Sequence, residues 1–134
     1  MSGLVLKLGP RERVMVNGVV MENGDRRTRI AILTPDAKVL RLRDAIHPDE
    51  AKTPVKRVVY VAQLVIAGEA DPEEGRRQVL RGIEQLSQVF TDAESRAHLA
   101  AATEAAAEGR FYQAMRALRN LLPRETRLLG QRPE

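Results

Sequence analysis

The amino-acid sequence predicts an α+β fold, in which a small antiparallel β-sheet precedes a helical unit of three to four helices. Short apolar runs and two Asn-Gly pairs fill the first 46 residues, a pattern typical of β-hairpins. From residue 53 onwards, apolar residues recur at helical spacing behind helix start signals. Residues 44–52 show neither period and contain a proline. The sequence therefore predicts a β-rich region, 1–52, and a helical region, 53–134.

The N-terminal region is expected to contain five short strands, at residues 4–8, 13–16, 19–22, 26–33 and 38–43. The turn-forming residues are two Asn-Gly pairs, Asn17-Gly18 and Asn23-Gly24, which lie six residues apart. Asn-Gly favours the type I′ turn, because both central residues of that turn need positive φ. We therefore predict two tight hairpins in succession.

Arginines alternate with aliphatic residues in the last two predicted strands. Each strand would then bury its aliphatic side chains on one face and present two arginines on the other. Guanidinium groups bind phosphate bidentately, so these arginines would form one basic surface if the two strands are neighbours. The candidate RNA-binding residues are Lys7, Arg26, Arg27, Arg29, Arg41 and Arg43.

The C-terminal region is expected to form helices over residues 54–67, 72–90, 92–108 and 111–122. Thr53 is a plausible N-cap, with Pro54 at the first helical position. The many β-branched residues between Val55 and Ile66 also fit a strand, so that segment stays open between the two. Pro123 is expected to end the last helix and to leave a frayed terminus.

Composition excludes several classes of function. The formal net charge is +4, and eighteen of the twenty-two basic residues are arginine, which suits a nucleic-acid partner. Cysteine is absent, and the two histidines, His47 and His98, have no companion at metal-ligand spacing. No nucleotide-binding or catalytic motif is present. We therefore expect a cytoplasmic, non-enzymatic protein without metal, cofactor or membrane span.

All four aromatic residues fall in the helical region, at Tyr60, Phe90, Phe111 and Tyr112. RNA-recognition motifs and single-strand-binding OB-folds stack bases on aromatic residues of their sheets. The sheet predicted here has none to offer. If this sheet binds RNA, it must use guanidinium groups, Lys7 and backbone groups.

Two stretches of the sequence resemble the FlbT family. The first is Val16-Asn17-Gly18 with Glu22-Asn23-Gly24-Asp25-Arg26-Arg27, preceded by the strand 4–8; the second is Lys52-Thr53-Pro54 with Tyr60 and Gln63-Leu64. The resemblance implies a cytoplasmic regulator of flagellin synthesis that acts on flagellin messenger RNA. The expected function is binding of the 5′ untranslated leader of that RNA, with an effect on its translation or stability.

A protein-binding function is the alternative. The chain would then be an adaptor or chaperone-like scaffold for flagellin or for FlaF, a partner that the family resemblance implies, without direct RNA contact. Phe111, Leu118 and Leu122 would form the partner face on the last helix. Three small alanines on the helix before it, Ala97, Ala101 and Ala105, would permit close approach of a neighbouring helix, either of this chain or of a second copy in a homo-oligomer.

Overall fold

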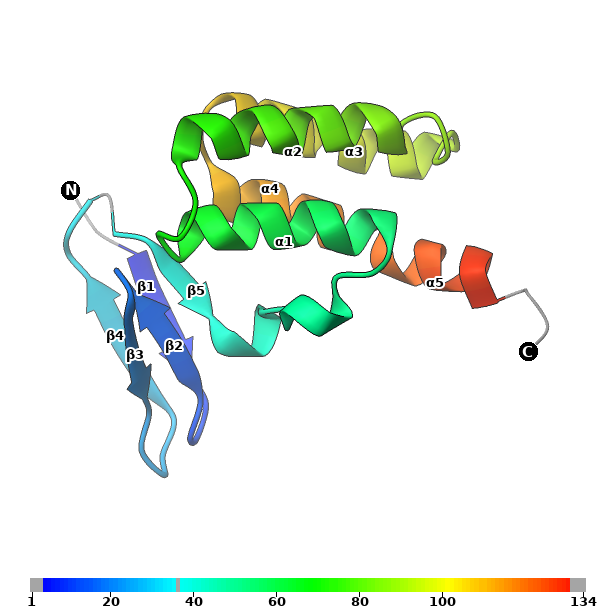
Figure 1. The fold of residues 1–134 in the computed structure, drawn as a ribbon. Coiled ribbons are helices and arrows are strands. Elements are labelled where there is room, and N and C mark those ends of the chain that lie inside the picture. The colour runs from blue at the N-terminus through cyan, green and yellow to red at the C-terminus, as the bar shows by residue number, and fades with distance from the viewer. Residues whose placement is uncertain (1–3, 36, 131–134) are drawn as a thin grey trace.

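The computed structural model describes residues 4–35 and 37–130, and it confirms the α+β fold (Figure 1). The strands are β1 (Leu4–Leu8), β2 (Arg13–Val16), β3 (Val19–Glu22), β4 (Thr28–Ile32) and β5 (Val39–Arg41). Two single turns of 3-10 helix follow, at Leu42–Asp44 and Pro48–Glu50. The α-helices are α1 (Pro54–Ile66), α2 (Pro72–Leu86), α3 (Ala93–Ala107), α4 (Phe111–Arg119) and α5 (Leu122–Gly130).

The strands form two small antiparallel sheets. In one sheet β1 pairs with β4, and in the other the strand order is β3-β2-β5. Leu6 and Leu8 of one sheet and Val14 of the other are buried together, with partly buried aliphatic residues of both sheets around them. The two sheets therefore enclose a hydrophobic core of their own. The arginines of β4 and β5 are expected to form one basic surface if these two strands are neighbours. The strands belong to different sheets, so this condition is not met.

The two Asn-Gly pairs behave differently. Asn17 and Gly18 have φ values of 50° and 85° and join β2 to β3, as predicted for a two-residue hairpin. The prediction for Asn23 and Gly24 is wrong, because neither has positive φ and β3 does not pair with β4. The reason is the Asn23 side chain. Its amide donates to the Gly9 carbonyl at 2.6 Å, and its oxygen accepts from the Thr28 hydroxyl at 2.9 Å, so it holds the loop against β1 and β4.

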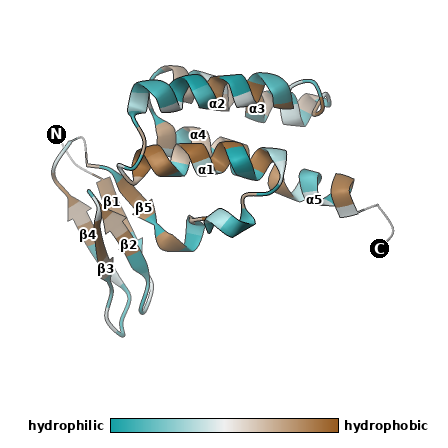
Figure 2. Cartoon of the chain, in the orientation of Figure 1, coloured by the Kyte–Doolittle hydropathy of each residue, from teal (hydrophilic) through white to brown (hydrophobic). Residues whose placement is uncertain are grey.

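Helices α1 to α4 form a closed bundle, in which α1 packs against α2 and α4, and α3 packs against the same two helices. Helix α1 is the most hydrophobic of them in Figure 2, and it carries the buried residues Val55, Val59 and Ala62. Thr53 caps α1 by accepting a hydrogen bond from the Lys56 N–H at 3.3 Å, which confirms the helical reading of this segment. Among the described residues, no helix has the length and apolar character needed to cross a bilayer.

The C-terminal helices correct two predictions. The helix expected over 111–122 ends at Arg119, and the chain starts a further helix, α5, instead of fraying at Pro123. The predicted partner face of Phe111, Leu118 and Leu122 is also not an exposed surface. Phe111 and Leu118 are 8% and 0% exposed, and Leu122 packs against the same core, because α1 and α3 cover this side of α4.

The sheets are fastened to the bundle through the segment that follows β5. Leu40 of β5 is buried in the helical core. The buried Gln63 side chain on α1 pairs with the Ile46 backbone, accepting from its N–H at 2.7 Å and donating to its carbonyl at 2.9 Å. Arg119 of α4 donates to the Asp44 carbonyl at 2.8 Å. These contacts fix where residues 42–46 lie between sheet and helices.

Candidate nucleic-acid interface

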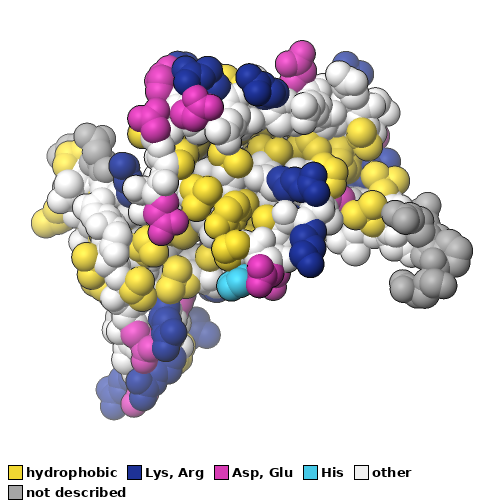
Figure 3. Space-filling view, in the orientation of Figure 1, with side chains coloured by type: hydrophobic (Ala, Val, Ile, Leu, Met, Phe, Trp, Pro, Cys, Tyr) yellow, Lys and Arg dark blue, Asp and Glu magenta, His cyan; other side chains and the backbone are white. Residues whose placement is uncertain are grey.

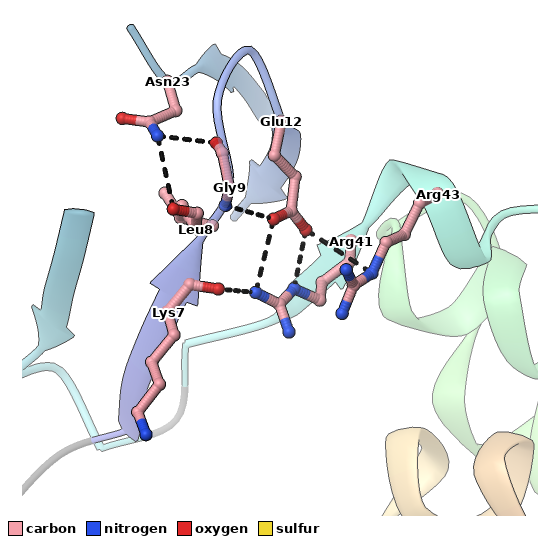
Figure 4. Close-up of polar contacts among 7 residues, drawn as sticks. All are labelled: Lys7, Leu8, Gly9, Glu12, Asn23, Arg41 and Arg43. Atoms are coloured by element: carbon pink, nitrogen blue, oxygen red, sulfur yellow. Dashed lines mark hydrogen bonds and ion pairs between the residues drawn. The ribbon is translucent and has the colours of Figure 1, made fainter. Parts of the chain in front are cut away.

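A carboxylate in the loop after β1 organises the basic side chains near it (Figure 4). Glu12 accepts a hydrogen bond from the Gly9 N–H at 2.9 Å and forms an ion pair with Arg41 at 2.8 Å. Arg41 also donates to the Lys7 carbonyl, and so joins β5 to β1 across the two sheets. The Gly9 hydrogen bond, together with Arg41 and Arg43, holds the pKa of Glu12 below its usual value, although burial opposes the shift.

Arg41 is therefore a structural residue, which corrects its assignment to the exposed basic face. Its side chain is 17% exposed, because the loop that carries Glu12 folds over the face where the alternation of β5 places Arg41. Arg43 differs from it. Arg43 lies in the 3-10 turn after β5, its side chain is 62% exposed, and its nearest carboxylate, that of Glu12, is 3.6 Å away. Arg43 can therefore turn towards a ligand while Arg41 stays in place.

A hollow on the sheets gathers four basic side chains. We call it the sheet hollow; its charged lining residues are Lys7, Glu12, Arg27, Arg29 and Arg43. Arg27, Arg29 and Lys7 are exposed, and no ion pair is found for any of the three within the part of the chain that the structure describes. Since Arg41 already pairs with Glu12, the hollow presents a net positive charge.

The other arginines near the sheets do not line this hollow. Basic side chains gather at the end of the sheets away from the helices, with acidic ones among them (Figure 3). There Arg11 pairs with Glu22 and Asp25, and Arg13 pairs with Glu22. Arg26 is exposed but does not line the sheet hollow. The structure thus brings together Lys7, Arg27, Arg29 and Arg43 of the predicted set.

A second hollow adjoins the first. We call it the helix hollow; it lies between the segment after β5 and α4, and its lining residues are Arg41, Arg43, Asp44, Tyr112, Arg116, Arg119 and Asn120. Arg43 lines both hollows, so the basic surface continues from the sheets onto α4. The sequence did not predict that α4 contributes residues to the basic surface, because no local pattern indicates that this helix lies beside a strand about seventy residues earlier.

Comparison with known proteins assigns the chain to a family. The family model described as flagellar protein FlbT matches residues 4–129. The chain belongs to the FlbT family. A Mesorhizobium japonicum protein named probable flagellum biosynthesis repressor protein FlbT is 30% identical over 127 residues, which cover 95% of this chain and 85% of the relative. Brucella abortus (strain S19) has a protein of the same name that is 28% identical over 132 residues, covering 98% of this chain and 86% of that protein.

No solved structure matches this FlbT-family chain. The family and the names of its relatives support a regulatory role in flagellum biosynthesis.

Proposed function

We propose that this protein regulates flagellin synthesis after transcription, by binding the 5′ untranslated leader of flagellin messenger RNA. The sheet hollow holds the RNA phosphates, and binding lowers translation, in keeping with the word repressor in the names of the relatives. Phosphate contacts supply the sequence-independent part of the affinity for nucleic acid, and guanidinium groups bind phosphates bidentately.

One observation carries this proposal. Lys7 of β1 and Arg29 of β4 are directly opposite each other in the antiparallel register, so their side chains leave the sheet on the same face. Like charges in such a pair destabilise a sheet. Arg27 lies immediately before β4, two residues from Arg29, and lines the same hollow. A phosphate between these groups removes the repulsion, so the arrangement favours an anionic ligand.

A titration of fluorescent leader RNA, followed by anisotropy, tests the proposal. Arg27→Ala combined with Arg29→Ala should weaken binding by about 100-fold or more, because each of the two lost charge-assisted contacts contributes about 1.5–3 kcal/mol and every ~1.4 kcal/mol is tenfold. The matched control removes two arginines from α2, as Arg76→Ala with Arg77→Ala. Those residues pair with Glu73 and Glu74 of their own helix, so this variant should bind nearly as the parent does.

A second RNA tests whether the binding depends on the RNA sequence. The leader should bind more tightly than a shuffled RNA of the same length and composition; equal binding would mean that only phosphate contacts, which do not distinguish sequences, hold the RNA. The reverse ranking of the two double variants would place the site on the helices. A parent protein that binds no RNA at low salt and micromolar concentration would refute the proposed function.

A further inference from the structure

We propose that Tyr112 and Arg116 of α4 bind one unpaired base of the RNA whose phosphates occupy the sheet hollow. This inference rests on the proposed function and extends it, because it assigns a base-binding position on the helices. Proteins that bind single-stranded nucleic acid combine a basic groove along the backbone with aromatic side chains on which bases stack. The sheets supply the first element and lack the second.

The position of Tyr112 supplies the missing element. Of the four aromatic residues, Phe90 and Phe111 are buried in the helical core, at 3% and 8% exposure. Tyr60 lines neither basic hollow. Tyr112 is half-buried and lines the helix hollow, with one side packed on the core. It is therefore the aromatic ring available beside the cations.

Arg116 adds a second surface for a base. It lies one helical turn after Tyr112, so the two side chains share one face of α4. Its guanidinium carbon is 6.0 Å from the centroid of the Tyr112 ring, and the side chain is exposed. Guanidinium planes and tyrosine rings are both surfaces on which unstacked RNA bases lie. Because Arg116 is exposed, it can move aside and cover a base that stacks on the ring.

The two hollows connect in a way that suits a continuous strand. Arg43 lines both, and it lies in the segment that Gln63 and Arg119 fasten to the helices. A phosphate at Arg43 would thus lie between those held by Lys7 and Arg29 and the nucleotide at Tyr112. The RNA path then runs from the sheets onto α4, with the base contact at its helical end.

A comparison of two oligomers tests the inference. The probes are an oligouridylate of about 12 nucleotides, within the range of site sizes for such proteins, and an abasic ribose-phosphate oligomer of equal length. Tyr112→Leu should weaken oligouridylate binding by about tenfold, the effect of one lost stacked base. It should leave abasic binding and the salt dependence unchanged, and Tyr112→Phe should bind as the parent does.

Each other result is decisive. Equal loss on both oligomers would mean that Tyr112 only supports the fold, and so would refute the base contact. Parent-like binding by Tyr112→Leu, with weakened binding by Arg27→Ala with Arg29→Ala, would refute the base contact and leave the proposed function standing. If Tyr112→Leu does not fold, the exposed Arg116→Gln gives the same test, with a loss expected on oligouridylate larger than on the abasic oligomer. A parent that binds neither oligomer nor leader RNA would refute both.

Discussion

Removal of the Glu125 carboxylate should destabilise the helical region through the start of α1. Glu125 is 5% exposed although it is charged. It accepts hydrogen bonds from the Thr53 hydroxyl at 2.5 Å and from the Val55 N–H at 2.9 Å, so a side chain of α5 caps the N-terminus of α1. Orphaned N–H groups and the positive end of the helix dipole both favour an anion there.

The expected magnitude follows from these two bonds. Glu125→Ala leaves a buried N–H and a partly buried hydroxyl without their acceptor. An unsatisfied buried group costs about 1–3 kcal/mol and the partly buried hydroxyl adds less, so we expect a loss of about 3 kcal/mol in the free energy of unfolding. Glu125→Gln keeps an acceptor for the Val55 N–H but loses the charge at the helix terminus, which corresponds to about 1 kcal/mol. Small domains have about 5–15 kcal/mol in total, so the alanine variant should differ clearly.

Urea unfolding followed by far-ultraviolet circular dichroism measures both variants. The matched control is Glu94→Gln, which removes another carboxylate from the first turn of a helix, α3, where the side chain is 87% exposed. Its effect should stay within about 0.5 kcal/mol, as for most surface substitutions. If Glu125→Ala unfolds at the same urea concentration as the parent, α5 does not cap α1.

Three further sets of substitutions test other parts of the fold. Gly18→Val should destabilise the sheets by more than about 1 kcal/mol, because φ is 85° there, whereas Gly24→Val should melt like the parent, since Gly24 lacks positive φ and has open space around it. Gly82→Ala should lower the urea concentration at the midpoint of unfolding, although alanine has the better helix propensity, because the new Cβ would lie 2.5 Å from a Val58 methyl. Adding Val58→Ala to this variant should restore the midpoint. The folded-state pKa of Glu12 lies below its ordinary value, so its contribution to stability is present above that ordinary value and is lost as pH falls through the lowered pKa. Glu12→Gln should therefore flatten the acid side of the curve of melting temperature against pH.

Local sequence signals predicted most of the elements. Helix starts were predictable, because Thr53 and Asp71 each accept a hydrogen bond from the N–H three residues later. The hairpin at Asn17-Gly18 was predictable for the same reason, since its φ requirements are local. The alternation in β4 also placed Arg29 outward correctly.

Features that depend on distant partners could not be predicted. Asn23-Gly24 has the sequence of a hairpin turn, but the Asn23 side chain donates a hydrogen bond to the Gly9 carbonyl, fourteen residues earlier. As a result β4 pairs with β1 and not with β3. Arg41 lies on the expected face of its strand, yet Glu12 covers that face. The acceptor for the start of α1 lies seventy residues away at Glu125. In each case a side chain contacts a group that is distant in the sequence, and no local sequence pattern predicts that contact.

The salt dependence of leader RNA binding is the most direct test of the proposal that Lys7, Arg27, Arg29 and Arg43 hold RNA phosphates. For single-stranded RNA, each phosphate contact contributes about 0.7 to the steepness of log affinity against log salt. Arg27→Ala with Arg29→Ala should therefore reduce that slope by roughly 1.4, with little change in melting temperature. An unchanged slope in a folded double variant would contradict the placement of the phosphates in the sheet hollow.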